Sequence, residues 1–376
     1  MRVSVISYDL SHNCLGRAYL MAKLVEPNHE VEILGPTLGD GIWGPVKDEF
    51  DYKSIGTDMR IFDSKKLVER SFQKVTGDVI YASKPRMSSY GTALFNRFQR
   101  DIPVILDIDD WETGFRHEWF GTIHRYPLGL INLLDLNSFY YTKFLEKYSA
   151  AADAITVSNS FLQDKFGGTV IPHVRDTDKF DPKKYDKFET RSDLGLPLDK
   201  KIIMFSGTPL PHKGVHDLVK AVRDLPSDDV VTVIVGADQS EYTAKLSNLG
   251  GESVIIRGQQ PFSEIPKWIS TADVIAIPQR ESASNGQIPA KVFDAMAMGK
   301  PIVASNMSDL DRILDECGIV IEPGSLHQLS DAIESLTDNP EYAAKLGENA
   351  RTKCIEEYSY QATAPVIDKI VREVAD

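Results

Sequence analysis

The stretch from Ser284 to Ser305, SNGQIPAKVFDAMAMGKPIVAS, constrains the fold of this chain more than any other. Proline suits the first position of a helix because its φ is fixed and it has no N–H that needs a partner, so we expect a helix to begin near Pro289. The body of that helix is almost wholly apolar, Gly299 ends it, and Ile302 to Ala304 form a short buried strand. A loop, a buried helix, a tight turn and a strand in direct succession are typical of a doubly wound α/β sheet.

The loop that leads into this helix has the chemistry of an anion site. A glycine-bearing loop before a helix leaves backbone N–H groups without partners beside the positive end of the helix dipole, so phosphate oxygens are common ligands there. The residues expected to face such a ligand are Gly286, Gln287, Ile288, Pro289 and Ala290. Asp294, inside the helix, would face back toward the ligand and accept hydrogen bonds from sugar or ribose hydroxyls. The alternative is a loop of the same pattern that binds nothing, as in many α/β proteins.

A second glycine loop, SGTPLPHKG from Ser206 to Gly214, follows the strand candidate Ile202 to Phe205. Gly207 and Thr208 come directly after the strand, and Lys213 precedes a helical pattern. Backbone N–H groups and a point charge in this order suit a phosphate. We therefore expect Lys213 to bind a phosphate group; the alternative is a solvated loop lysine.

Five short apolar runs in the first half predict a parallel sheet with crossover helices. They are Val3–Ile6, Val31–Leu34, Val79–Tyr81, Val104–Asp107 and Ala154–Val157. The carboxyl ends of parallel strands meet at one edge, so we expect the loop with His12, Asn13 and Gly16 to lie near the loop that follows the fourth strand. In that fourth loop, Asp109 and Asp110 could orient a substrate or act as a base, or alternatively cap a helix or face solvent.

Composition limits the classes of partner and location. The chain has 376 residues, enough for two domains of average size, and its net charge of -13 argues against nucleic acid or an anionic membrane as a partner of the whole surface. Cys14, Cys317 and Cys354 have neither the spacing of a zinc site nor that of a disulfide framework, so a reducing cytoplasm is expected. We identify no signal peptide and no apolar run of membrane-spanning length. The aromatic stretch from Phe115 to Tyr148 predicts a long helix packed on the sheet or, alternatively, a surface that touches an acceptor or a membrane.

Both glycine loops resemble the donor-binding segments of a known family, the retaining, nucleotide-sugar-dependent glycosyltransferases with the GT-B fold, of the family 4 type (glycosyl transferases group 1). In that family the first segment carries a glutamate, seven residues and a second glutamate; here Asp294 stands at the second position and Gly286 at the first. The second segment carries Gly-Arg and later Lys-Gly. Gly207 and Lys213 match this pattern, while Thr208 replaces the arginine.

The resemblance also assigns roles to further residues. The stretch from Arg257 to Gln279 resembles the family's nucleotide-base loop, and the residues placed against the base are Gly258, Gln259 and Gln260. The implied catalytic residues are Lys213, which would stabilise charge on the departing diphosphate, Asp294, which would hold donor hydroxyls, and Asp110, which would act on the acceptor. The implied loop for acceptor and phosphate contains His12, Asn13, Gly16 and Asp109.

The implied architecture is α/β, with two Rossmann-like doubly wound domains. Residues 1–185 would form an acceptor-side domain, residues 186–357 a domain that binds the nucleotide sugar, and residues 358–376 a helix that returns to the first domain. The implied reaction is metal-independent transfer of a hexose, with retention, from a nucleoside diphosphate sugar to a hydroxyl of a glycan, lipid or small molecule. No cofactor besides this co-substrate, no metal and no nucleic acid is expected, and the enzyme would act in the cytoplasm, free or peripheral to the inner face of the membrane. A nucleotide-sugar epimerase of the same fold and a non-catalytic nucleotide-sugar-binding protein are the alternatives.

Overall fold

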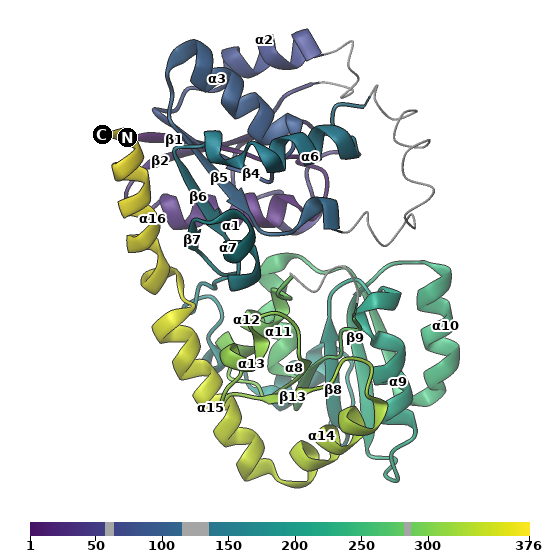
Figure 1. Cartoon of the computed structure of the whole chain (residues 1–376). Coiled ribbons are helices and arrows are strands. Elements are labelled where there is room, and N and C mark those ends of the chain that lie inside the picture. The colour runs from purple at the N-terminus through teal and green to yellow at the C-terminus, as the bar shows by residue number, and fades with distance from the viewer. Residues whose placement is uncertain (57–63, 115–134, 282–286) are drawn as a thin grey trace. The chain divides into compact units, whose positions relative to one another are not determined.

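The computed structural model describes residues 1–56, 64–114, 135–281 and 287–376, which divide into two compact units. The first unit contains Met1–His173 and Thr363–Asp376, and the second contains Val174–Ala362. The boundaries expected from the sequence, at residues 185 and 357, both fall inside the second unit. Each unit is a parallel β-sheet with helices on both faces, so the predicted class of two doubly wound α/β sheets is confirmed (Figure 1).

The sheet of the first unit has the strand order β3-β2-β1-β4-β5-β6-β7, and its strands pair in parallel. The strands are β1 (Arg2–Ile6), β2 (Glu30–Gly35), β3 (Tyr52–Ser54), β4 (Val79–Ser83), β5 (Val104–Ile108), β6 (Ala154–Val157) and β7 (Thr169–Val170). The strands expected from the sequence are all present, and β3 and β7 extend the sheet at its edges. The chain order reverses between β1 and β4, and ligands of such sheets bind beyond the carboxyl ends of the strands at such a point.

Helices cover both faces of this first sheet. They are α1 (Leu15–Val25), α2 (Ser64–Lys74), α3 (Thr92–Arg100), α6 (Phe139–Lys147) and α7 (Ser160–Phe166), with a π-helical turn, Met87–Gly91, before α3. Figure 1 shows α2, α3 and α6 on one side of the sheet and α1 on the other. Strands covered on both faces need apolar side chains on both, and β4 and β5 are accordingly buried at every residue. Of the aromatic stretch 115–148, residues 139–147 form α6, and residues 115–134 lie outside the described part of the chain.

The last helix, α16 (Tyr360–Ala375), starts in the second unit and ends in the first. His29 Nε2 lies 2.7 Å from Asp368 Oδ1, so this helix is tied to the segment just before β2. Figure 1 shows both chain ends close together in the first unit. The predicted return of the C-terminal helix to the first domain is therefore seen in the structure.

The sheet of the second unit has the order β10-β9-β8-β11-β12-β13, again parallel, and it reverses between β8 and β11. Its strands are β8 (Lys201–Ser206), β9 (Val230–Ala237), β10 (Val254–Gly258), β11 (Val274–Ile277), β12 (Ile302–Ser305) and β13 (Ile319–Ile321). Its helices are α8 (Lys187–Asp193), α9 (Val215–Arg223), α10 (Glu241–Gly250), α11 (Ile265–Ser270), α12 (Lys291–Ala297), α13 (Leu310–Ile313), α14 (Leu326–Asp338) and α15 (Pro340–Glu357). Figure 1 shows α9 and α10 on one side of this sheet and α8, α11 and α12 on the other.

The helix predicted to begin near Pro289 is α12, but it begins at Lys291. Pro289 O and Ala290 O accept from N–H groups three residues later, at 3.1 and 3.2 Å, so a tighter turn precedes the α-helix. The predicted end is confirmed. Gly299 has a φ of 60°, its N–H donates to Met296 O, and the next N–H reaches back five residues, which is a Schellman motif.

Candidate functional site

At the carboxyl ends of β8 and β9 glycines expose the backbone, because they carry no side chain that would cover it. Gly207 follows β8 with a φ of 126°, which side-chain-bearing residues rarely adopt, and its N–H donates to Val235 O at 2.6 Å. Gly236, near the end of β9, has a φ of 98°, and a Cβ on it would lie 3.1 Å from the Cα of Gly207. The two glycines therefore allow neighbouring strand ends to pack backbone against backbone, at the edge where α/β sheets bind ligands.

Lys213 lies in the loop that continues from this strand end. It closes a 3₁₀ turn, Pro211–Lys213, and the next residue, Gly214, has a φ of 66°. A Cβ on Gly214 would overlap Pro278 O, so the loop packs tightly against the segment that follows β11. Lys213 Nζ donates to Thr208 O at 2.8 Å, which places the ammonium over the start of its own loop. The structure thus brings together Thr208 and Lys213, which the sequence analysis predicted to bind the nucleotide-sugar donor.

A second lysine, Lys291, reaches the same strand end from α12. A Cβ on Gly207 would lie 2.5 Å from Lys291 Nζ, so the ammonium occupies the space that the glycine leaves. Lys291 Nζ also lies 5.4 Å from the centre of the Phe205 ring, at the end of β8. Sequence reasoning missed this residue, although a lysine that opens a helix whose other residues, apart from Asp294, are apolar was an available signal.

The two lysines form a positive cluster that the charge of Asp294, itself paired with Arg175, offsets only in part. Burial, and then the charge of Lys291, lower the pKa of Lys213 to about 7. Burial also lowers the pKa of Lys291, although Asp294 opposes the effect. Among the residues that the structure describes, neither ammonium forms an ion pair with a carboxylate. Desolvated, mutually repelling cations at a strand end favour an anionic ligand.

Asp294 is held by an arginine that the sequence analysis did not single out. Arg175 Nε donates to Asp294 Oδ1 in a buried ion pair, and Arg175 Nη2 donates to Ala290 O at 2.9 Å. The arginine thereby fixes both the residue before α12 and the acid inside it. Arg175 leaves acceptor capacity on the Asp294 carboxylate, above all on Oδ2, and the predicted contact of Asp294 with donor hydroxyls stays a prediction.

The other residues expected to bind the donor lie at two places in the second unit. At the end of β10, Gly258 and Gln259 are exposed, and Gln260 Nε2 donates to Gly258 O at 3.1 Å. Before α12, Ile288 is buried and Gln287, Pro289 and Ala290 are partly buried. Gly286 lies outside the described residues. The strand order places β9 between β8 and β10, so the ends with Gly207 and Gly258 lie along one edge of the sheet.

In the first unit, the carboxylates that follow β5 surround a buried lysine. Lys84 follows β4 with a φ of 71°, a strained conformation for a residue other than glycine. Its Nζ lies 2.9 Å from Asp109 Oδ1, 2.7 Å from Asp110 Oδ2 and 2.8 Å from Glu112 Oε1. No group of three or more His, Cys, Asp or Glu side chains among the described residues is arranged to hold a metal ion. These acids therefore form an ion-pair cluster around Lys84, and the predicted action of Asp109 and Asp110 on an acceptor stays a prediction.

The members of this Lys84 cluster differ in protonation. Burial raises the pKa of Asp109 to about 7 despite the nearby Lys84, and the charge of Asp110 adds to the rise. Burial would also raise the pKa of Glu112, but the charges of Arg86 and Lys84 outweigh it and lower that pKa to about 2. Asp109 is thus the acid of the cluster that exchanges a proton near neutral pH.

The first loop of the unit contributes exposed residues and a buried anchor. His12 and Asn13 are exposed, and their carbonyls accept from Leu15 and Gly16 N–H at 3.0 Å, so they form the turn into α1. His12 Nε2 lies 3.7 Å from Asp9 Oδ2. One turn later, and missed by the sequence analysis, Arg17 pairs with both oxygens of Asp107 at 2.9 Å. Asp107 therefore fixes the end of β5, while Asp109 and Asp110 face the Lys84 cluster.

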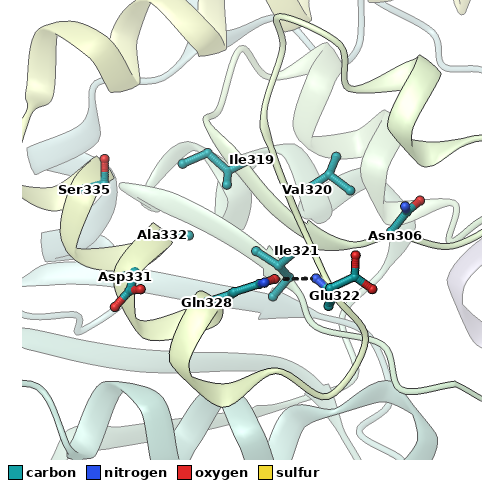
Figure 2. A pocket seen from close by; sticks show the side chains of 9 residues that line it. All are labelled: Asn306, Ile319, Val320, Ile321, Glu322, Gln328, Asp331, Ala332 and Ser335. Atoms are coloured by element: carbon teal, nitrogen blue, oxygen red, sulfur yellow. Dashed lines mark hydrogen bonds between the residues drawn. The ribbon is translucent and has the colours of Figure 1, made fainter.

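A separate hollow of about 440 Å³ opens beside the edge strand β13 and α14 (Figure 2). Its lining residues are Asn306, Ile319, Val320, Ile321, Glu322, Gln328, Asp331, Ala332 and Ser335. Figure 2 shows Gln328 Oε1 accepting from the N–H of Glu322 across one side of it, at 2.7 Å. The lining holds two acids and no lysine, arginine or histidine, so it lacks the charge that a diphosphate requires.

Residues 186–353, which lie within the second unit, match the family model described as Glycosyl transferases group 1. Two curated relatives are alpha-D-kanosaminyltransferase from Streptomyces kanamyceticus and D-inositol 3-phosphate glycosyltransferase from Corynebacterium glutamicum. The first is 26% identical over 193 residues, 50% of this chain and 49% of the relative. The second is 28% identical over 197 residues, 49% of this chain and 46% of the relative. The chain spans about half the length of the curated relatives it matches.

Solved structures with the same fold cover the whole chain. Sucrose-phosphate synthase from Thermosynechococcus elongatus has a TM-score of 0.73 at 17% identity, covering 100% of this chain and 99% of that one. Anabaena Alr3699/HepE in complex with UDP-glucose has a TM-score of 0.74 at 15% identity, covering 99% and 100%. These likenesses show that the two doubly wound units have the GT-B fold.

Proposed function

We propose that this chain is a glycosyltransferase that moves a sugar from a nucleoside diphosphate sugar to a hydroxyl acceptor. The observation that carries the proposal is Lys213, which lies over the end of β8 with its ammonium hydrogen-bonded to Thr208 O and unpaired with any carboxylate of the described chain. The domain that holds it matches a glycosyl transferases group 1 model. A cation fixed beside a glycine strand end is suited to a diphosphate.

In the proposed reaction the second unit binds the donor. As the bond between the anomeric carbon and the diphosphate breaks, negative charge develops on the leaving group, and Lys213 stabilises that charge from a fixed position. We propose that Gly258, Gln259 and Gln260 contact the base and that Asp294 Oδ2 accepts from a donor hydroxyl. The solved complex of Anabaena Alr3699/HepE with UDP-glucose supports a nucleotide-sugar donor for a chain of this fold.

The finer features of the reaction follow from the family resemblance. We propose that the sugar is a hexose, that its anomeric configuration is retained and that leaving-group stabilisation rests on lysine rather than on a metal. The first unit would bind the acceptor, a hydroxyl of a glycan, lipid or small molecule, with Asp109 and Asp110 at the carboxyl end of β5. The relatives quoted above are named as transferases, which does not favour an epimerase or a non-catalytic binding protein.

The proposed location is the cytoplasm, free or at the inner face of a membrane. Its support is that Cys14, Cys317 and Cys354 are all free thiols. Within the described ranges, no helix combines the length and apolarity needed to cross a bilayer.

The test is calorimetric titration of the wild type and Lys213→Ala with UDP, GDP, ADP and dTDP sugars, with and without EDTA. A charge-assisted hydrogen bond contributes about 1.5–3 kcal/mol, so Lys213→Ala should bind its donor roughly 10- to 100-fold more weakly. The matched control is Lys245→Ala, because Lys245 is an exposed lysine of α10 in the same unit and forms an exposed pair with Glu241. It should bind as the wild type does. Binding of no donor by the wild type, or of one donor equally by all three proteins, would refute the proposal.

Turnover separates the proposed transferase from its alternatives. A transferase releases nucleoside diphosphate only when a hydroxyl acceptor is present, whereas an epimerase changes the donor without an acceptor. A donor that binds but yields no product with any acceptor of a broad glycan, lipid and polyol panel would identify a non-catalytic binding protein.

A further inference from the structure

We infer that Lys291 is the second cation of the donor site and that it grips the donor diphosphate together with Lys213. The inference rests on the proposed nucleotide-sugar chemistry and adds to it a residue for which the two glycine loops gave no indication. Lys291 would also supply the second positive charge for the diphosphate, because Thr208 stands where the resembling family carries an arginine.

The first support is position. The ammonium of Lys291 lies so close to Gly207 that a Cβ on that glycine would be 2.5 Å from Nζ. The ammonium of Lys213 is bonded to the carbonyl of Thr208, the very next residue. Two ammonium groups from different elements, the Pro211–Lys213 turn and α12, therefore flank one dipeptide at the end of β8.

The second support is that Lys291, which is partly buried, lacks the partners that two other lysines of the described chain, one buried and one partly buried, possess. Lys84 is surrounded by three carboxylates, and Lys300 donates to Ser270 O and Ala272 O at 2.7 and 2.9 Å. Lys291 has no hydrogen bond and no ion pair with any residue that the structure describes. A structural lysine at a partly buried position gains from such partners, because even partial removal of an uncompensated charge from water is costly. The missing partner is supplied by an anionic ligand.

The third support is charge balance. A donor diphosphate carries two negative charges, and breaking the glycosidic bond adds to the charge on the leaving group. Lys213 alone compensates one of these charges. With Lys291 the fixed positive charge matches the diphosphate, and no arginine at position 208 is required.

The surroundings of the pair predict that donor binding takes up a proton. The titratable and charged groups that act on the two ammoniums are His212, Arg175 and Asp294. Burial, helped by the charge of Lys291, lowers the pKa of Lys213, and burial lowers that of Lys291, so the empty site is not fully charged near pH 7. A bound diphosphate raises both pKa values, so affinity should fall as the pH rises above about 7.

The test titrates the wild type, Lys291→Gln, Lys213→Gln and the control Lys245→Gln with UDP, GDP and ADP, and with the matching nucleosides. We expect Lys291→Gln to bind the diphosphate about 10- to 100-fold more weakly and the nucleoside unchanged, because only the diphosphate contacts the ammonium. In two buffers of unlike ionisation enthalpy, the wild type should take up more protons on binding than Lys291→Gln does. Equal diphosphate affinity of Lys291→Gln and the wild type would overturn the inference.

A protection experiment and a comparison of the two lysine variants complete the test. Should Lys291→Gln not fold, acylation of the wild type with an amine reagent, read by mass spectrometry, replaces it. UDP, GDP or ADP should then protect Lys291 and leave Lys245 reactive; labelling of Lys291 that no nucleotide changes overturns the inference. If Lys213→Gln loses affinity while Lys291→Gln does not, only this inference fails. If no diphosphate binds the wild type, the proposed function itself fails.

Discussion

Replacing Lys84 by methionine tests the buried ion-pair cluster of the first unit. Methionine keeps most of the side-chain volume but removes the ammonium that contacts Asp109, Asp110 and Glu112 at 2.7 to 2.9 Å. Removing one partner of a buried ion pair leaves an uncompensated charge and costs roughly 3–5 kcal/mol. Glu112 keeps its contact with Arg86, so the loss falls mainly on the two aspartates.

The same substitution should change the pH dependence of stability in a defined direction. The pKa of Asp109 is raised in the folded state, so its charged form opposes folding and stability declines as the pH rises toward and through about 7. Without Lys84 less positive charge stabilises the ionised form of Asp109, so the pKa of Asp109 rises further. We therefore expect the stability gap between Lys84→Met and the wild type to be wider at pH 8 than at pH 5.

The assay is urea denaturation at pH 5, 6.5 and 8, followed by circular dichroism and by hydrogen exchange of β4 and β5, because a two-unit chain need not unfold in one step. The control is Lys369→Met, since Lys369 belongs to an exposed pair with Glu373 on α16, in the same unit, and its loss should cost at most about 1 kcal/mol. The double variant Lys84→Met/Asp109→Asn should recover part of the loss. If Lys84→Met matched the wild type at pH 8, or if the gap were largest at pH 5, this account of the cluster would be wrong.

Two further predictions concern backbone and thiols. Gly214→Ala places a Cβ against Pro278 O at a left-handed φ, so it should lower the free energy of unfolding by about 2–4 kcal/mol. The measurement is denaturation of the second unit, and an unchanged midpoint would contradict the close approach of Gly214 to Pro278. Burial raises the pKa of Cys14 and of Cys354 to about 12, so neither thiol should react appreciably with iodoacetamide at pH 7.5 until denaturant is added; rapid labelling of the native protein, seen by mass spectrometry, would show that they are exposed.

Local sequence patterns were sufficient for the scaffold and for part of the site. Five apolar runs predicted the parallel sheet of the first unit, because strands covered on both faces must be largely apolar. For the second unit the local patterns gave the strands β8 and β12, and the family resemblance implied the rest of its sheet. Gly299 was recognised as a helix end because its role depends only on neighbouring residues. Lys213 was singled out for the same reason, since a glycine after a strand and a lysine before a helix lie in one short loop.

The residues that sequence reasoning missed all depend on contacts between distant segments. Arg175 meets Asp294 across 119 positions of sequence, and Arg17 meets Asp107 across 90. Lys84 meets its carboxylates only because β4 and β5 pair in the sheet. Lys291 reaches Gly207 only because α12 packs at the end of β8. The spacing of residues within one segment does not predict contacts between distant segments. The start of α12 was misplaced for a smaller reason, because proline is compatible with the tight turn before a helix as well as with its first residue.

The division of the chain has a consequence for synthesis. The second unit is a continuous segment, Val174–Ala362, whereas the first needs residues from both ends, including the contact between His29 and Asp368. A ribosome delivers the chain from its N-terminus, so the second unit can complete its fold while the first still lacks α16. The part made first is thus the part finished last. Until then the face of the first unit that receives α16 stands uncovered, and loss of a few C-terminal residues would damage the opposite end of the sequence.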